Sequence, residues 1–433
     1  MAAKKPPANR RVAIVGGLRT PFVKAGTDLK NVPVLDLSAT LVSEMIERNH
    51  LDPAVVDQVV YGTVIPDLRG PNIARELVLR TRLRDATDAY SVTRACATST
   101  QALVNAAQSI LSGDADVVIA GGAESMSQPP VTVSDQMASA LTAAAAARDP
   151  GSKAKALTAL RPKDLLPSTP ALEERSTGLT MGQSAEKMAR ENGIGRDEQD
   201  AYALSSHQKA VEGWEKGIYE QEVMPFPVPP GYTAVIEKDG IPRADTSLEK
   251  LASLKPVFDR AYGTVTAGNS SPLTDGAAAL ILMRASTAKD LGYEPLAYIK
   301  TWAFAALDPG WQLLMGPSFA TPKALDKAGM TMGDIDIVDM HEAFSAQVLS
   351  NLQAFASADW AKKHLGRDKA IGEIDPESMN PYGGSISLGH PFGATGARQI
   401  LTMSHELVRR DKGTALITQC AAGGLGATVI LER

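Results

Sequence analysis

Two cysteines occur in the chain, and the first of them has the surroundings of a nucleophile. Cys96 lies where an extended, β-branched segment, residues 91–94, passes into an alanine-rich stretch for which we predict a helix over residues 95–112. A thiol at the start of a helix faces free backbone N–H groups and the positive end of the helix dipole, and both favour the reactive thiolate. A small buried side chain without a chemical role is the alternative interpretation, because most free cysteines are of that kind.

The second cysteine stands in a glycine-rich turn near the end of the chain. Cys420 follows an apolar strand predicted over residues 415–418 and begins the sequence CAAGGLG at 420–426. Where side chains are this small the backbone can approach a ligand closely, and its N–H groups can bind an anion. An ordinary turn before the last strand would explain the same residues.

Two histidines lie in contexts that packing alone does not explain. His390 is embedded in the glycine-rich sequence GGSISLGHPFGATG at 383–396, and glycine weakens ordered structure unless the backbone geometry demands it. His341 follows an apolar strand predicted over residues 335–340. The carboxyl ends of strands are where open α/β sheets place their functional sites. We therefore predict a functional role for both imidazoles.

Strand and helix signals alternate along the chain, which predicts an α/β fold with a mostly parallel sheet covered by helices. The chain also resembles itself. A turn of small residues opens a long helix that leads to a glycine-terminated strand over residues 95–122, and the same succession returns over 390–424. This internal repeat predicts two related α/β halves.

The stretch between the halves has a different character. It contains a run of alanines at 143–147, a basic run at 153–163 and a proline-rich run at 225–230, so we predict an inserted loop domain. Helical periodicity is expected over 176–192, with a second helix over 193–210. The apolar residues before the basic run are typical of a helix at a membrane surface or a partner, and equally of a helix that covers the mouth of a site.

Composition excludes several classes of protein. The chain has 433 residues, 44% of them hydrophobic and 21% charged, as expected for a globular protein of two or three packed units. The net charge of -5 gives no basis for nucleic-acid binding, which needs clustered Lys and Arg. No apolar run approaches the roughly 20 residues of a membrane span, and the first eleven residues read as a solvated leader. Two cysteines cannot build a disulfide framework, which favours a reducing compartment.

Three other kinds of site are disfavoured by spacing. Zinc ligands usually come as close Cys or His pairs, and the chain has none, so no metal is expected. A G-x-S-x-G elbow is absent, which argues against a Ser-His-Asp hydrolase, and the glycine runs do not form a dinucleotide-binding G-x-G-x-x-G fingerprint. The remaining histidines, in charged or helical contexts, have no predicted role: His50, His207, His364 and His405.

Taken together, these motifs resemble the thiolase family over nearly the whole chain. Four blocks match in order, namely the segment around Cys96, the sequence TAGNSS at 266–271, the segment around His390 and the segment around Cys420. The resemblance implies an α/β fold of two duplicated βαβαβαββ halves layered α-β-α-β-α, with an inserted loop domain. The implied divisions are a leader at 1–11, an N-terminal half at 12–124 and 272–292, a loop domain at 125–271 and a C-terminal half at 293–433.

Within the family, the chain most resembles the β subunit of the trifunctional fatty-acid β-oxidation complex. That subunit also has the sequence His-Glu-Ala-Phe, here beginning at His341, and an enlarged loop domain. Many other thiolases have asparagine in place of His341, and a histidine near the substrate where this chain has Met181 with its neighbours Thr180 and Gly182. These departures favour longer acyl chains over acetoacetyl-CoA.

The resemblance implies an acetyl-CoA C-acyltransferase that cleaves 3-ketoacyl-CoA through an acyl thioester on Cys96. His390 would take the proton from Cys96, and Cys420 would protonate the departing acetyl-CoA carbanion and later deprotonate CoA. Two oxyanions need donors in this scheme. His390 and His341 are the implied donors to the enolate, and the backbone N–H groups of Cys96 and Ala422 are the implied donors to the tetrahedral oxyanion.

The same resemblance implies the ligands and partners. CoA is a co-substrate, and no permanently bound cofactor is expected. Ser271 matches a position that touches the pantetheine of CoA, although a simple turn explains it equally, and Asn269 and Met181 complete the expected substrate contacts. A homodimer or higher homo-oligomer is implied, as are a hydratase/dehydrogenase α subunit and contact of the loop domain with a membrane surface, for a protein of the cytoplasm.

Three rival functions remain at this point. An acetoacetyl-CoA-specific acetyltransferase would run the condensation, and a decarboxylating ketoacyl synthase would pair one cysteine with two histidines. A non-catalytic acyl-CoA-binding scaffold would keep the fold alone. Cys420 argues against the synthase, and the joint presence of Cys96, His390 and Cys420 argues against the scaffold.

Overall fold

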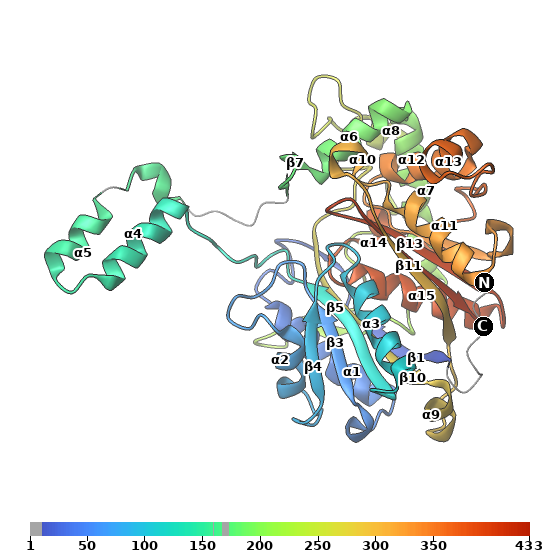
Figure 1. Ribbon diagram of the computed structural model, residues 1–433, viewed down its shortest axis with the longest axis horizontal. Coiled ribbons are helices and arrows are strands. Elements are labelled where there is room, and N and C mark those ends of the chain that lie inside the picture. Colours follow the sequence, from blue (N-terminus) through green and yellow to red (C-terminus); the bar gives the residue numbers. More distant parts are fainter. Residues whose placement is uncertain (1–10, 159, 167–172) are drawn as a thin grey trace.

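The computed structural model describes residues 11–158, 160–166 and 173–433. Figure 1 shows a body of helices and strands from which one helical hairpin projects. The predicted leader lies outside the described residues except for Arg11. Among the helices that the structure describes, none combines the length and the apolar character needed to cross a bilayer.

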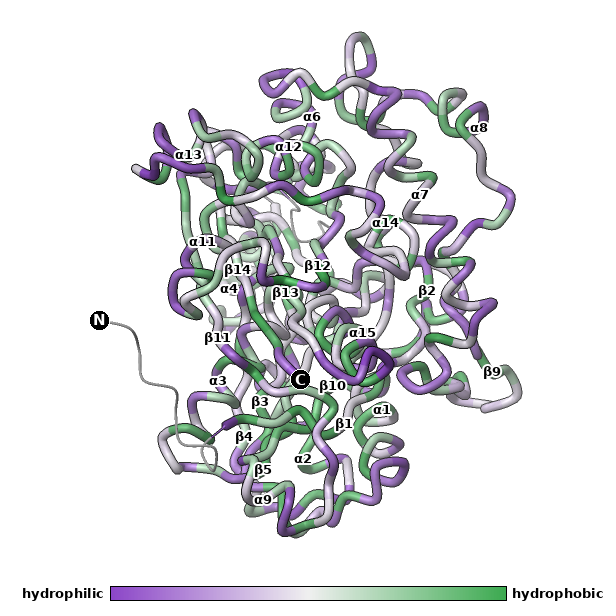
Figure 2. Tube along the Cα trace, turned by 90° about the vertical axis from the view of Figure 1, so that its right-hand side faces the viewer, coloured by the Kyte–Doolittle hydropathy of each residue, from purple (hydrophilic) through white to green (hydrophobic). Residues whose placement is uncertain are grey.

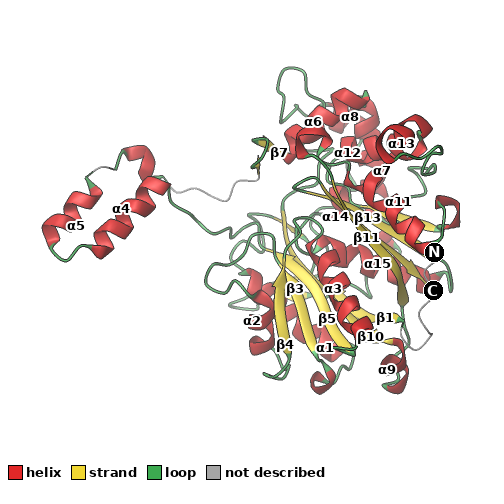
Figure 3. Ribbon diagram, in the orientation of Figure 1, coloured by secondary structure: helices red, strands yellow, loops and turns green. Residues whose placement is uncertain are grey.

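One twisted sheet, ten-stranded in the described part of the chain, runs through the body (Figure 3). Its hydrogen-bonded order is β12-β13-β14-β11-β1-β10-β5-β3-β4, with β2 paired to β10. The strands are β1 (Val12–Arg19), β2 (Val23–Lys24), β3 (Gln58–Gly62), β4 (Asp88–Val92), β5 (Val117–Glu124), β10 (Thr274–Arg284), β11 (Ala297–Ala306), β12 (Ile337–Met340), β13 (Thr414–Ala421) and β14 (Leu425–Glu432).

The prediction of a mostly parallel sheet was wrong for the centre of this sheet. β3 is parallel to β4 and β5, and β12 is parallel to β13. The neighbours from β5 through β10, β1, β11 and β14 to β13 are all antiparallel. Parallel neighbours need a long crossover, whereas a short turn at 422–424 joins β13 to β14 and therefore makes that pair antiparallel.

The helices lie on both faces of the sheet and in the stretch between the halves. They are α1 (Val34–Arg48), α2 (Ile73–Arg80), α3 (Thr98–Ser112), α4 (Asp135–Ala146), α5 (Pro150–Leu157), α6 (Met181–Asn192), α7 (Arg196–Glu215), α8 (Leu248–Ala252), α9 (Ala285–Asp290), α10 (Pro309–Gln312), α11 (Gly316–Ala328), α12 (Ser345–Ala356), α13 (Ala358–Leu365), α14 (Ser385–Leu388) and α15 (Thr395–Arg409). Short 3-10 turns are η2 (Pro53–Val55), η3 (Pro162–Leu165) and η4 (Met332–Asp334), and two small hairpins pair β6 (Glu173–Glu174) with β7 (Leu179–Thr180) and β8 (Phe226–Pro227) with β9 (Val235–Ile236).

The molecule has five layers, α-β-α-β-α, which pack around three apolar cores. The middle core joins α3 and α15 to strands of both halves of the sheet. A second core packs α1 and α2 against the other face of the N-terminal strands, and a third packs α11 and α12 against the other face of the C-terminal strands. Side chains of β10 alternate between the first two cores, as a strand with both faces covered requires. Figure 2 shows hydrophobic segments along these strands and hydrophilic ones at the periphery, for example beside α13.

The two halves repeat the same succession of elements. In the first half α3 leads into β5, which is parallel to β3, and in the second α15 leads into β13, which is parallel to β12. Two further antiparallel strands lead toward the centre of the sheet in each half, β10 and β1 in the first and β14 and β11 in the second. The halves meet where β1 pairs with β11, through Ala13–Tyr298 and Ile14–Ala297. The duplicated halves in α-β-α-β-α layers agree with the predicted fold class.

The stretch 125–271 contributes α4 to α8. Figure 1 shows the hairpin of α4 and α5 held away from the body of the molecule. The helix expected over 176–192 begins only at Met181, and the one expected over 193–210 extends to Glu215. α6 and α7 pack against α12 of the C-terminal half, so this part of the stretch belongs to the body that surrounds the site.

A buried ion-pair cluster ties this stretch to β1, and its removal should destabilise the fold. The guanidinium of Arg19 is fully buried and pairs with Glu222 (2.8 Å) and Asp239 (2.7 Å). Arg19→Met would leave both carboxylates buried without their cation, and we expect a loss of about 3–5 kcal/mol in the free energy of unfolding. Denaturant unfolding measures this loss.

Arg48→Met is the matched control, because Arg48 pairs with Glu44 at the surface, where the side chains are 35% and 41% exposed. It should cost less than about 1 kcal/mol. Equal losses for the two variants would contradict the structural role given to Arg19.

Candidate active site

Cys96 sits on a strained turn between β4 and α3. The preceding residue, Ala95, has φ 44, a left-handed conformation that costs a residue with a side chain of the order of 1 kcal/mol or more. The Thr98 hydroxyl fixes this turn, since it accepts from the Arg94 backbone N–H (2.8 Å) and donates to the Ala95 carbonyl (2.7 Å). α3 begins at Thr98 and not at Ala95 as predicted. The sulfur is therefore presented from a turn just before the helix.

The electrostatic surroundings of Cys96 differ from the expectation of a stabilised thiolate. Burial raises the pKa of the thiol to about 11, and the charge of Glu124 acts in the same direction. The backbone N–H groups of Ala422 and of Cys96 itself oppose this rise in pKa, but they do not outweigh burial. At neutral pH the free protein therefore holds Cys96 as a thiol, and a base must remove its proton.

His390 has the hydrogen bonds of a base in a defined tautomer. The Thr395 hydroxyl donates to the Pro391 carbonyl (3.0 Å), so it accepts from Nδ1–H of His390 (2.7 Å). The lone pair is then on Nε2, which is buried and has no hydrogen-bond partner among the described residues. Burial, followed by the charge of Arg398, lowers the pKa of His390 to about 3, so the ring is neutral. The loop lies close against β5, since a Cβ on Gly393 would come within 2.4 Å of the Ala123 carbonyl oxygen.

His341 follows β12, as predicted, and lies beside His390. The two ring centroids are 4.2 Å apart at an interplanar angle of 47°. The Nδ1 atom of His341 bonds to the Ser385 hydroxyl (2.8 Å), and its buried Nε2 is likewise without a partner in the described part of the chain. Burial and the neighbouring His390 lower the pKa of His341 far below its ordinary range. Both imidazoles thus keep one nitrogen free and hold the other in a hydroxyl contact.

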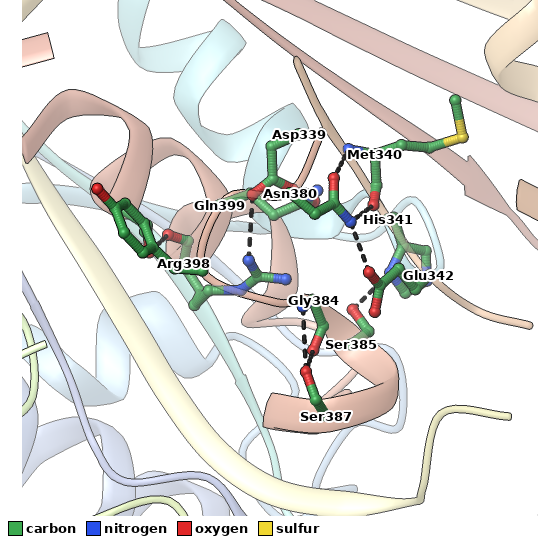
Figure 4. Close-up of polar contacts among 12 residues, drawn as sticks. Asp339, Met340, His341, Glu342, Asn380, Gly384, Ser385, Ser387, Arg398 and Gln399 are labelled. Atoms are coloured by element: carbon green, nitrogen blue, oxygen red, sulfur yellow. Dashed lines mark hydrogen bonds and ion pairs between the residues drawn. The ribbon is translucent and has the colours of Figure 1, made fainter. Parts of the chain in front are cut away.

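A buried carboxylate holds the elements around His341 in place (Figure 4). Glu342 accepts hydrogen bonds from the Tyr202 hydroxyl (3.0 Å), the Ser206 hydroxyl (2.7 Å), the Asn380 side-chain amide (2.7 Å) and the Ile386 backbone N–H (3.2 Å). Two of these donors come from α7 and one from α14, which also carries Ser385. Glu342 therefore fixes the Ser385 hydroxyl relative to His341. In the sequence, only the position of Glu342 beside His341 points to this role.

The structure brings the predicted nucleophile and both histidines to one point. The sulfur of Cys96 and ring nitrogens of His341 and His390 all lie within 4.8 Å of one another. Cys420 is fully buried on β13, opposite Gly426 of β14. Burial and the charge of Cys96 raise the pKa of Cys420 far above its ordinary value. Cys96 packs against the cluster that contains Ala421, the residue after Cys420. The Ala422 N–H lies against the Cys96 sulfur.

A cavity of about 670 Å³ lies near this point, although Cys96, His341, His390 and Cys420 do not line it. Ser271, a predicted CoA contact, lines it, and so does Leu273, whose backbone pairs with that of His390. Three cations also line the cavity: Lys24, Arg243 and Lys250. The sequence did not single out these cations, because they are far apart in the chain and only the fold gathers them.

The other two predicted substrate contacts are placed differently. The side chain of Asn269 is buried and used within the protein, since it donates to Asp200 (2.9 Å) and accepts from the Thr266 backbone N–H (2.8 Å). Asn269 thus shapes the loop beside Ser271, and its side chain has no free group for a substrate. Met181, at the start of α6, packs against the apolar cluster that contains Cys420.

His207, for which the sequence predicted no role, is buried beside the same cavity. It lies on α7, is only 5% exposed, and lines the same cavity as Ser271. Burial lowers its pKa to about 4, so the ring is neutral at pH 7. Its burial follows from the packing of α7 against α12 and α14, which the sequence around His207 does not reveal.

The raised pKa of Cys96 predicts the pH dependence of its alkylation. Because the thiolate is the reactive form, the rate with iodoacetamide should rise about tenfold per pH unit through the neutral range and level off only near pH 11. Mass spectrometry of the peptide containing Cys96 measures this rate separately from that of Cys420. A plateau below pH 8 would instead indicate a preformed thiolate–imidazolium pair and would contradict the neutral pair described above.

Comparison with known proteins identifies the family to which this site belongs. Models of the thiolase N-terminal domain and the thiolase C-terminal domain match residues 12–286 and 293–433. The chain belongs to the thiolase family. A 3-ketoacyl-CoA thiolase of Photobacterium profundum is 52% identical over 423 residues, which are 98% of this chain and 97% of that thiolase.

Solved thiolase structures share the fold. The acetyl-CoA acetyltransferase of Bacillus anthracis is 33% identical with a TM-score of 0.84, over 98% of both chains. Human mitochondrial 3-ketoacyl-CoA thiolase in complex with CoA is 31% identical with a TM-score of 0.81, again over 98% of both chains. These comparisons confirm the predicted family, the duplicated α/β fold and the acyltransferase class of this thiolase.

Proposed function

We propose that this thiolase cleaves 3-ketoacyl-CoA with CoA, giving acetyl-CoA and a shortened acyl-CoA, as a step of fatty-acid β-oxidation. The observation that carries the proposal is the convergence of Cys96, His341 and His390 on one point beside a second buried cysteine. A relative named 3-ketoacyl-CoA thiolase, 52% identical over nearly the whole chain, supports the substrate.

His390 acts as the general base in the first transfer. Its neutral Nε2 takes the proton of the Cys96 thiol while the sulfur attacks the 3-keto carbon. The hydrogen bond from Nδ1–H to Thr395 supports this role, because it leaves the lone pair on Nε2. Both groups start neutral, so the proton moves as the new carbon–sulfur bond forms.

Two sets of donors stabilise the charges that develop. The backbone N–H groups of Cys96 and Ala422 bind the tetrahedral oxyanion on the carbon that Cys96 attacks, and each such donor contributes about 3 kcal/mol in a preorganised site. His341, together with the protonated His390, binds the enolate oxygen of the departing acetyl-CoA. The contact of His341 with Ser385 supports its fixed orientation.

Cys420 acts as acid and then as base. Its raised pKa keeps it protonated at neutral pH, so it can donate a proton to the carbanion that forms when the carbon–carbon bond breaks. Acetyl-CoA then leaves and CoA enters. Cys420 takes the proton of the CoA thiol, and the new thiolate removes the acyl group from Cys96.

CoA binds in the cavity lined by Ser271. Lys24 and Arg243, with Lys250 beside its partner Asp245, supply positive charge for its phosphates. Leu273, which also lines the cavity, pairs through its backbone with His390. The CoA complex of human mitochondrial 3-ketoacyl-CoA thiolase supports this assignment. No metal or permanently bound cofactor takes part in these steps.

A thiolysis assay across 3-ketoacyl-CoA chain lengths tests the proposal. We expect CoA-dependent cleavage that extends to chains longer than acetoacetyl-CoA, with an acyl adduct on Cys96 in the absence of CoA. Activity with acetoacetyl-CoA alone would indicate the short-chain acetyltransferase. Binding of acyl-CoA without an adduct would indicate a scaffold without catalytic function.

We further propose a cytoplasmic homo-oligomer that works with a hydratase/dehydrogenase α subunit and touches a membrane surface through the predicted loop domain, residues 125–271. The projecting hairpin supports this role, because Ala140 is the one residue of α4 that is buried. Leu141 and Leu157 are exposed, beside lysines of α5. Deleting residues 131–163 should impair association with the α subunit or with anionic vesicles more than turnover of short substrates. Unchanged association of the deletion variant would refute the role proposed for the hairpin.

A further inference from the structure

The three groups that meet at the catalytic point are also a set of zinc ligands. Thiolate and imidazole are the ligands that zinc prefers, and three protein ligands with one open position are typical of zinc sites that bind a further molecule. Close pairs along the sequence are missing here, because Cys96, His341 and His390 come from three separate loops. The fold nevertheless brings their donor atoms within 4.8 Å of one another.

Both imidazoles are oriented as zinc-bound histidines are. A zinc-bound histidine holds its second ring nitrogen in a hydrogen bond to a group outside the metal site. Here Nδ1 of His390 bonds to Thr395 and Nδ1 of His341 bonds to Ser385. The buried Nε2 atoms of both rings have no hydrogen-bond partner within the described ranges. The proposed function uses the same two atoms for the substrate, so a metal bound there would compete with it, and His341 would bind the metal as the tautomer with its proton on Nδ1.

We propose that Cys96, His341 and His390 form a three-ligand site for Zn²⁺, and that zinc bound there excludes the 3-ketoacyl group and inhibits the enzyme. On binding, the Cys96 S–H bond breaks, a sulfur–zinc bond forms, and the proton goes to solvent. The fourth position is left for water or the thiol of CoA. Metal binding is independent of the proposed function, whereas the inhibition depends on it.

The geometry requires only a modest closure. At bond lengths of about 2.3 Å to sulfur and 2.0 Å to nitrogen, tetrahedral ligand atoms are about 3.5 Å apart. The present separations of up to 4.8 Å must therefore shrink by about 1 Å. Rotation of the Cys96 side chain and small shifts of the two rings supply this closure.

Cobalt replaces zinc as a spectroscopic probe in the test. Co²⁺ alone is titrated into the full-length, metal-free protein, and we expect one ion per chain with a sulfur-to-cobalt charge-transfer band that Zn²⁺ abolishes. Cys96→Ala should lose the band. His341→Asn should raise the dissociation constant at least about tenfold, because losing even the hydrogen-bond partner of a metal ligand lowers metal affinity by that factor.

His405→Asn is the matched control, because His405 also has a buried Nε2 without a partner in the described part of the chain but lies outside the group. It should leave the dissociation constant unchanged. A band that survives in Cys96→Ala, or unchanged binding in His341→Asn, would overturn the proposal. Thermal unfolding of each variant verifies that it is folded.

Inhibition is measured separately. Zn²⁺ should inhibit thiolysis reversibly, with recovery on adding a chelator, and 3-ketoacyl-CoA should protect. An active enzyme without the cobalt band would overturn the zinc site alone. A protein that shows the band but has no thiolysis activity would overturn the proposed function and leave the metal site standing.

Discussion

Cys96→Ala is expected to lower kcat for thiolysis by on the order of 10⁴-fold or more, because it removes the sulfur that carries the acyl group in the proposed function. The variant should fold normally. Cys96 packs in a cluster of small residues that includes Ala97 and Ala421, so an alanine fits there without a large cavity. Steady-state assays measure the loss, and intact-protein mass spectrometry should find no acyl adduct.

Cys420→Ala provides the comparison for this variant. It keeps the nucleophile and its base, so an acyl adduct on Cys96 should still form slowly with substrate although turnover is lost. An adduct on another residue of Cys96→Ala, or residual activity above about 1% of wild type, would remove Cys96 from the role of nucleophile.

His390→Asn is expected to lower kcat by about 10³-fold, within the range for loss of a general base that also donates to an oxyanion. The substrate should still bind, because the cavity lined by Ser271 remains, so KM should change far less than kcat. The rate of acyl-enzyme formation in a single turnover isolates the step in which His390 acts.

Thr395→Val tests the tautomer of His390 separately. It keeps the shape of the side chain but removes the hydroxyl that accepts from Nδ1–H. We expect a loss of about 10- to 100-fold in kcat, smaller than that of His390→Asn. Wild-type rates in Thr395→Val would show that the hydrogen bond does not set the orientation of the ring.

The sequence predicted the parts of the site that are carried by local motifs. Cys96, His390 and Cys420 stand in glycine- or alanine-rich segments, and those small residues correspond to real close approaches. Gly393 lies against the Ala123 carbonyl oxygen, where any side chain would collide. His341 was predicted from its place at the end of a strand. Local composition and the end of a strand singled out these four residues, and the resemblance to thiolases implied their roles.

What the sequence did not predict depends on contacts between distant segments. The direction of β10 and β14 is set by their neighbours in the sheet and not by their own residues. The pKa of Cys96 was expected to fall at a helix N-terminus, but the buried surroundings raise it, and burial is not visible in a short motif. The spacing rule for zinc does not apply to the three groups of the proposed zinc site for the same reason, since it detects only ligands close in the chain.

The junction of β1 and β11 has a consequence for how the enzyme is divided. Cys96 belongs to the first half, whereas His341, His390 and Cys420 all belong to the second. A chain cut between β10 and β11 would separate the attacking sulfur from every group that handles its proton. Reassembly of the fragments through the pairs Ala13–Tyr298 and Ile14–Ala297 would then govern catalysis. In the proposed function the two duplicated halves therefore supply different groups to one reaction.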